Sequence, residues 1–154
     1  MFRILLLLLL AGGGFLLARP YCADEVSEPE RVRVVLRGMA QGSEEGNLAD
    51  VLVHVSTAYS DADGLDKPGI AALMYREFVR RGRILVVLGP IQVSIDPEVQ
   101  EAEAVFTAAL GEDIDGGLLT IIPENVDALN FKVFLGMEEG EWRVTGHTRQ
   151  EVFR

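Results

Sequence analysis

Serine, threonine, tyrosine and aspartate side chains crowd into one short stretch, VSTAYSDADG at residues 55–64, between two apolar segments. Side chains of these types do three kinds of work in proteins. Their oxygens bind a metal ion, they share a proton at a catalytic site, or they hydrogen-bond backbone N–H groups at a bend. Spacing and the surrounding elements must discriminate between these uses.

A calcium-binding loop is the most specific of the three. Such a loop requires glycine at its sixth position and glutamate at its twelfth. Counted from Asp61, these positions hold Asp66 and Ala72. The stretch does not match, so we predict neither a metal nor another cofactor here.

A bend fits the stretch better. Ser56 and Asp61 are suited to accept backbone N–H groups, Gly64 to supply a positive φ, and Tyr59 to pack its ring inward. We therefore take Ser56, Tyr59, Asp61 and Gly64 as a loop motif whose expected role is structural.

Catalysis would need a base and an acid held together, as in proton abstraction beside a carbonyl. The candidates are Tyr59, Tyr75, His147, Glu77 and His54, and spacing brings no two of them together. His147 lies in an alternating segment and is predicted to point away from the face of Trp142, while Glu77 is spaced to pair with Arg80 or Arg81. His54, between two valines, is expected to be an ordinary, partly exposed histidine. We assign no catalytic residue.

The chain has 154 residues, enough for one domain, and a formal net charge of −10. All 24 acidic residues but only 12 of the 14 basic residues follow residue 23, so residues 24–154 carry 12 − 24 = −12. A nucleic-acid-binding face is basic. The only basic cluster, at Arg76–Arg83, is predicted to be a solvated helix end, so we predict no nucleic-acid partner.

The N-terminus reads MFRILLLLLLAGGGFLLARPYCADE, an arginine and an apolar block followed by a polar flank. This order is typical of a secretory signal peptide. Because the block is shorter than the ~20 residues that span a bilayer, we assign residues 1–23 as a cleaved signal, with an uncleaved anchor or acylation of Cys22 as alternatives. We expect an exported protein of the bacterial periplasm or cell envelope, which touches a membrane only if this segment is retained or lipidated.

Helical periodicity fills the first half of residues 24–154. Ser27 and Glu30 form a predicted capping box before a helix that ends near Gly42 or Gly46, and a helix of about two turns follows from Leu48. A third helix is predicted after Asp66, its N-cap, and before Gly82.

The second half shows the alternation of strands. Residues 84–96 form one long strand with a bend at Gly89-Pro90, and residues 99–110 form a strand although their alanines and glutamates also suit a helix. Two further strands lie around 126–137 and from 142 onward. The segment at 111–125 is expected either to cover the domain or to meet a partner, or else to form a short helix over the core. This pattern predicts an α+β fold, with three helices packed in the concave face of a curved, mainly antiparallel sheet.

This order of elements resembles the nuclear transport factor 2-like (NTF2-like) superfamily, a cystatin-like cone of helices and bent sheet. The resemblance is carried by the Ser56, Tyr59, Asp61 and Gly64 pattern and by EEGEWRVTGHTRQ at 138–150. It implies one domain at 24–154, and exported members of unknown function are similar. The superfamily also includes isomerases and dehydratases.

The apolar face of the sheet and its row of alanines predict a cavity for a hydrophobic small molecule. Six aromatic residues are candidates to line or fill it: Tyr59, Tyr75, Phe78, Phe106, Phe131 and Trp142. We expect a non-enzymatic binding or accessory domain, with a homodimer as one expected partner. The alternative is a small isomerase- or dehydratase-type enzyme that uses the same cavity.

Overall fold

The computed structural model describes residues 26–81, 84–112 and 128–151. The predicted signal at 1–23 and nearly all of the segment at 111–125 lie outside these residues. The described helices are α2 (Glu28–Glu45), α3 (Leu48–Leu52) and α4 (Lys67–Arg81). The strands are β1 (Ile84–Leu88), β2 (Gln92–Asp96), β3 (Glu101–Glu112), β4 (Ala128–Glu138) and β5 (Glu141–Glu151). The predicted order of helices and then strands is confirmed.

The helix ends follow local hydrogen bonding. Asp66 caps α4 as predicted, because its Oδ1 accepts the Gly69 N–H at 2.8 Å. The predicted capping box on α2 is wrong. The Ser27 side chain makes no cap bond, and the Glu30 carboxylate instead binds Arg33 and Arg37. Two cations within reach of one carboxylate outcompete a backbone N–H.

All five strands form one antiparallel sheet in which β3 is the long central strand. β1 pairs with its second half and β2 with its first half, while β4 and β5 continue the sheet on the other side. The predicted strand at 84–96 is therefore divided at Gly89-Pro90, where the Gly89 N–H donates to the Thr107 carbonyl at 2.8 Å. The predicted strand at 99–110 is confirmed as β3, apart from its first two residues.

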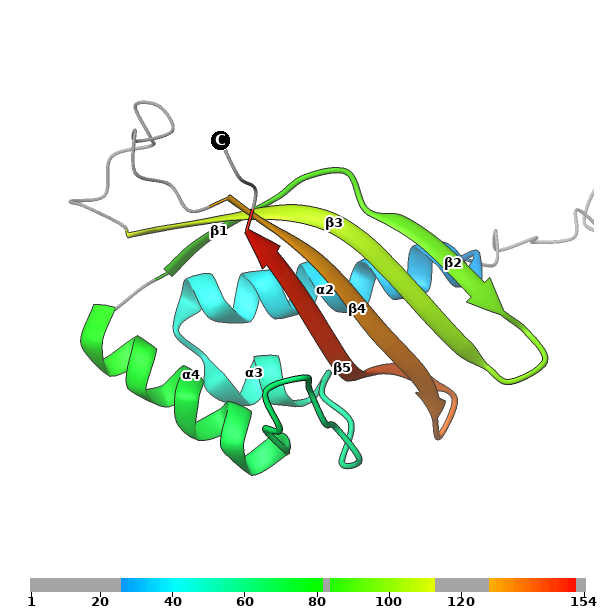
Figure 1. Cartoon of the computed structure of the whole chain (residues 1–154), viewed down its shortest axis with the longest axis horizontal. Coiled ribbons are helices and arrows are strands. Elements are labelled where there is room, and N and C mark those ends of the chain that lie inside the picture. Colours follow the sequence, from blue (N-terminus) through cyan, green and yellow to red (C-terminus); the bar gives the residue numbers. More distant parts are fainter. Residues whose placement is uncertain (1–25, 82–83, 113–127, 152–154) are drawn as a thin grey trace, which may run out of the picture.

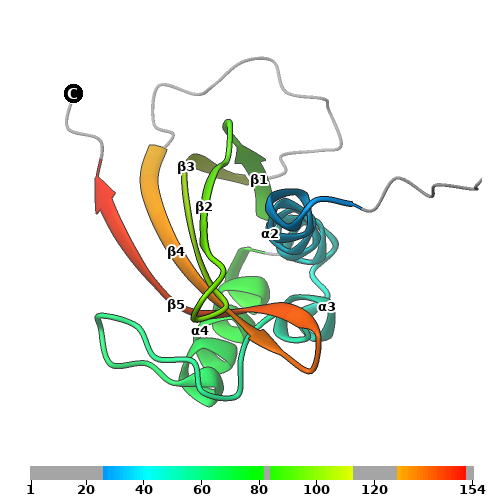
Figure 2. The same cartoon turned by 90° about the vertical axis from the view of Figure 1, so that its right-hand side faces the viewer.

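The sheet is curved and wraps α2, with α3 and α4 lying below its concave face (Figures 1 and 2). The inward side chains of β3 are buried and mostly small, as predicted from their alternation: Ala102, Ala104, Phe106 and Ala108. They face Val32, Val35 and Leu36 of α2 in one core cluster. None of the helices in the described ranges is both long and apolar enough to span a bilayer.

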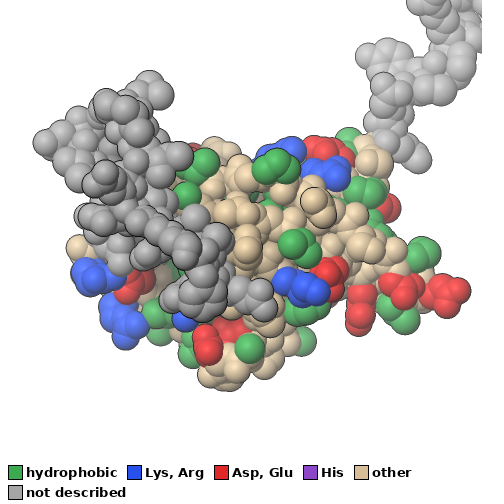
Figure 3. All heavy atoms as spheres, turned by 45° about the horizontal axis from the view of Figure 1, so that its top comes forward, with side chains coloured by type: hydrophobic (Ala, Val, Ile, Leu, Met, Phe, Trp, Pro, Cys, Tyr) green, Lys and Arg blue, Asp and Glu red, His purple; other side chains and the backbone are tan. Residues whose placement is uncertain are grey.

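The outer face of the sheet mixes apolar and charged side chains (Figure 3). Val105 and Phe134 are 39% and 38% exposed there, and Lys132 forms an ion pair with Glu103 at 2.9 Å. The predicted homodimer stays a prediction.

Candidate functional site

A cavity of about 320 Å³ lies between the helices and the concave face of the sheet. Small side chains on β3 help to leave it open, because Ala108 presents only a methyl group. Its walls are aliphatic and aromatic except for Ser43, Tyr59 and His147, and it is lined by Leu36, Met39, Ala40, Ser43, Val51, Val55, Tyr59, Ile70, Met74, Val86, Leu88, Phe106, Ala108, Phe131, Val133, Val144 and His147. The cavity is thus apolar with very few polar groups.

Three of the six predicted aromatic residues, Tyr59, Phe106 and Phe131, line this cavity. The rings of Phe106 and Phe131 stack across β3 and β4 with centroids 5.8 Å apart.

The other three candidates, Tyr75, Phe78 and Trp142, are not among the described residues that line the cavity. On α4 it is Ile70 and Met74 that reach the cavity. Tyr75 is 62% exposed because the next residue of a helix is rotated by about 100°. Phe78 is half-buried one turn further along α4. Trp142 is buried but donates its Nε1–H to Glu28 at 2.7 Å at the start of α2.

Tyr59 and His147 form the polar wall of the cavity, and we call them the cavity pair. The Tyr59 hydroxyl lies 2.7 Å from Nδ1 of His147 and donates to Oδ2 of Asp61 at 3.2 Å. The other oxygen of Asp61 accepts the N–H groups of Asp63 and Leu65 at 3.0 and 2.9 Å. Asp61 is therefore held by its own loop, and through Tyr59 it reaches an imidazole that lines the cavity.

The prediction that His147 points away from the core face is wrong, and a β-bulge explains the error. Leu135 pairs with Val144 but Phe134 pairs with Gly146, so Thr145 is an extra residue in β5. One extra residue reverses the alternation of all side chains beyond it. His147 consequently lies opposite the buried Val133. The glycine inside the strand, Gly146, was the sequence signal for this bulge.

Burial and charge set the ionisation of these groups. Burial raises the pKa of the Tyr59 phenol, and Asp61 raises it further. Burial also acts to raise the pKa of Asp61, but the hydrogen bonds from Leu65, Tyr59 and Asp63 outweigh it and lower the pKa overall. Burial lowers the pKa of His147, which Asp61 opposes and Arg149 reinforces. At neutral pH the phenol is protonated, the carboxylate is charged and the imidazole is neutral.

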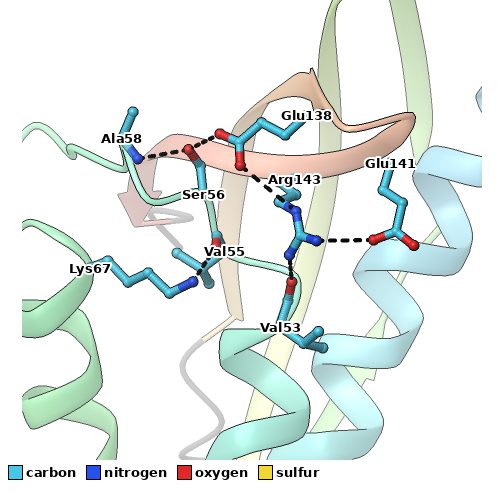
Figure 4. Close-up of polar contacts among 8 residues, drawn as sticks. All are labelled: Val53, Val55, Ser56, Ala58, Lys67, Glu138, Glu141 and Arg143. Carbon is cyan, nitrogen blue, oxygen red and sulfur yellow. Dashed lines mark hydrogen bonds and ion pairs between the residues drawn. The ribbon is translucent and has the colours of Figure 1, made fainter.

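The other end of the 55–64 stretch carries a second polar group, which we call the saturated cluster: Ser56, Glu138 and Arg143 (Figure 4). Ser56 is fully buried; its hydroxyl donates to Glu138 and accepts the Ala58 N–H at 2.9 Å. Arg143 lies 3.7 Å from Glu138 and donates to the Val53 carbonyl.

The saturated cluster borders a polar hollow of about 510 Å³ whose lining includes Lys67 and Arg143. Both cations hydrogen-bond to oxygen atoms of the protein. Lys67 donates to the Val55 carbonyl at 2.6 Å, and Arg143 also binds Glu141 at 3.0 Å. The arrangement ties the loop to the β4–β5 hairpin, and both cations contribute to that link.

The remaining residues of the loop and the other ionisable candidates have structural surroundings. Gly64 has a φ of +78°, the positive value predicted for the bend. Glu77 pairs with Arg80 at 2.5 Å, as predicted. His54 is half-buried beside Gly38 of α2. Across the described ranges, no group of three or more potential metal-binding side chains occurs.

Comparison with known proteins identifies similar structures but no related sequence. No family model matches the sequence, and no curated protein matches it. The structure is similar to an NTF2-like protein with a cystatin-like fold from Novosphingobium aromaticivorans, with a TM-score of 0.63, 14% identity, and coverage of 81% of this chain and 82% of that one. The chain has the NTF2-like fold.

Two further solved structures are similar to the chain. A protein from Streptomyces avermitilis, described as a possible dehydratase of the NTF2-like family, has a TM-score of 0.65 at 13% identity. The match covers 81% of this chain and 96% of that one. A Bdellovibrio bacteriovorus protein has a TM-score of 0.66 at 6% identity; the match covers 80% of this chain but only 40% of that one. The fold predicted from the resemblance is confirmed. Identities this low carry no activity across, because one fold hosts many functions.

Proposed function

We propose that the protein is an exported binding module that holds a small apolar molecule in its cone. The observation that carries this proposal is the cavity of about 320 Å³ with almost entirely apolar walls. Ligand sites are typically concave, mostly apolar and oriented by few polar groups. The cavity pair would supply those polar groups here.

The size of the cavity indicates the size of the ligand. An apolar cavity of about 150 Å³ accepts one benzene ring. A cavity of about 320 Å³ therefore has room for two fused rings or a comparable aliphatic skeleton. Naphthalene derivatives are suitable probes, because they fluoresce and their binding can be followed by anisotropy.

The test uses protein purified from cells that express the full chain. We expect 2-methoxynaphthalene to bind with a micromolar Kd. Ala108→Leu, which fills the cavity from β3, should abolish binding, whereas Val105→Leu on the outer face of the same strand should not. Urea unfolding confirms that both variants fold. Equal binding by both variants, or none by the unaltered protein, would reject the proposal.

The cell compartment has its own test. Mass spectrometry of protein from the host envelope should find a chain that begins near residue 24, together with any co-purified ligand. Full-length chain confined to the cytosol would contradict export.

A small isomerase- or dehydratase-type enzyme is the second candidate, favoured by the approach of Asp61, Tyr59 and His147 at the cavity wall. Neutral His147 is a suitable base. However, Tyr59 already donates to Asp61, and the described residues that line the cavity include no carboxylate. Exchange of α-hydrogens of 2-tetralone in D2O, followed by NMR, distinguishes the candidates. The enzyme predicts exchange that His147→Phe abolishes, whereas the binding module predicts only the buffer rate.

A further inference from the structure

The hydrogen bonds of the cavity pair fix which atom is the donor and which is the acceptor in each contact. Asp61, charged at neutral pH, can only accept, so its contact with Tyr59 requires the phenol proton. The Tyr59 oxygen has then no proton left for His147, 2.7 Å away. The contact is a hydrogen bond only if Nδ1 of His147 carries the proton and donates it. The reverse arrangement would place two acceptors, the Tyr59 and Asp61 oxygens, against each other.

This direction leaves the second ring nitrogen, Nε2, without a proton. No described residue hydrogen-bonds Nε2, and the described part of the chain contains no buried side-chain nitrogen or oxygen that lacks a partner. Nε2 must therefore have accessible surface. His147 lines the cavity and Ser43 uses its hydroxyl on the Met39 carbonyl, so Nε2 is the candidate acceptor for a ligand in the cavity.

We propose that Asp61 and Tyr59 hold His147 as its Nδ1–H tautomer, and that the bare Nε2 selects apolar ligands that carry a hydroxyl group. The proposal rests on the binding function above and names its ligand class: a compact alcohol or phenol of about two rings. Asp61 and Tyr59 are positioning residues in this scheme, and His147 makes the contact.

The tautomer is tested directly, without any ligand. Nitrogen-15 NMR of the labelled protein at pH 7.5 should show His147 with Nδ1 protonated and Nε2 bare. A protonated Nε2 would overturn the proposal, whatever binds in the cavity.

The ligand class is tested by a ratio that cancels the hydrophobicity of the probes. The Kd of 2-methoxynaphthalene divided by that of 2-naphthol should fall about three- to tenfold from the unaltered protein to His147→Phe, the value of one hydrogen bond. Val105→Leu is the control and should keep the ratio. An unchanged ratio in His147→Phe overturns the proposed ligand class. If neither probe binds at all, the binding function itself fails.

Asp61→Asn provides the sharpest variant. Its carbonyl should stay on the N–H groups of Asp63 and Leu65, which places the amide NH2 against Tyr59. The chain of protons then reverses: the amide donates to Tyr59, Tyr59 donates to Nδ1, and Nε2 gains the proton. We expect the NMR tautomer to switch and 2-naphthaldehyde, an acceptor, to gain affinity relative to 2-naphthol. An Nδ1–H tautomer in the folded variant would contradict the role of Asp61.

Discussion

The two ends of the 55–64 stretch use the same kinds of side chain for different purposes. At one end, the buried hydroxyl of Ser56 both donates and accepts, and Arg143 is shared among three oxygen-bearing groups. At the other end, Nε2 of His147 has no hydrogen-bond partner among the described residues. The saturated cluster holds the loop on β5, whereas the cavity pair has capacity to bind. What separates a structural polar group from a candidate site is an atom left open beside a cavity.

Gly146→Ala should have the largest effect, because this glycine lies where β5 meets the loop that joins both ends. A Cβ there would lie 2.6 Å from the Ser60 carbonyl oxygen, a backbone atom that the bond from Ser60 N–H to Thr145 holds in place. We expect a loss of about 3 kcal/mol in the free energy of unfolding, measured in urea. Gly136→Ala is the control; its Cβ would meet only a Thr145 methyl group at 3.3 Å. Equal losses would show that the contact with the loop is unimportant.

Ser56→Ala should destabilise the fold without touching the cavity. It leaves the Ala58 N–H and one oxygen of Glu138 without their buried partner, at a cost of about 2 kcal/mol. The affinity for 2-methoxynaphthalene should not change. Thr57→Ala, at the exposed neighbouring position, should cost less than about 0.5 kcal/mol. A change in probe affinity in Ser56→Ala would remove the distinction between the two ends.

Tyr59→Phe should change ligand preference more than stability. Loss of the phenol removes the acceptor of the His147 Nδ1–H, so stability should fall by only about 1 kcal/mol. Both tautomers of His147 then become accessible, and the preference for 2-naphthol should weaken. Tyr75→Phe, on the exposed face of α4, should change neither quantity. An unaltered preference would disconnect Tyr59 from ligand selection.

Acid should produce the smallest effect, and one that differs between the ends. Burial lowers the pKa of both His147 and His54; Asp61, Asp63 and Arg149 also act on the first, and Arg143, Glu141 and Asp50 on the second. As the pH falls, these histidines therefore gain a proton in the unfolded chain at a higher pH than in the folded chain. Their contribution to the free energy of unfolding is fully present above the ordinary histidine pKa of about 6.5 and declines as the pH falls toward the lowered pKa values of the folded protein.

Binding should follow His147 alone. As pH falls through the pKa of His147, Nε2 gains a proton and 2-naphthol should lose its advantage over 2-methoxynaphthalene. His54→Gln should reduce the pH dependence of unfolding in urea and leave that of binding intact. A binding profile that shifts in His54→Gln would contradict the assignment to His147.

Much of the fold follows from the sequence because its signals are local. The alternation of Ala102, Ala104, Phe106 and Ala108 predicts β3 correctly despite their helix-forming composition, and Asp66 marks the start of α4. Phe106 and Phe131 are likewise found from the apolar faces of their strands, and Tyr59 from the loop motif in which its ring was expected to pack inward. On α4, Ile70 and Met74 line the cavity, whereas Phe78, on the same side one turn later, and the exposed Tyr75 do not; periodicity gives the side of a helix but not how far along it a cavity extends.

The sequence by itself determined the α+β order, the bend at Gly64 and the apolar side of the sheet, because each depends on residues near one another in the chain. Only the tertiary structure decided that His147 joins Tyr59. The two residues of that contact are 88 positions apart, and the contact depends on one extra residue in β5. The sequence predicts that the His147 side chain faces outward, but the extra residue turns it toward the cavity. A register shift of this kind is set by pairing between strands, and local periodicity carries no information about that pairing.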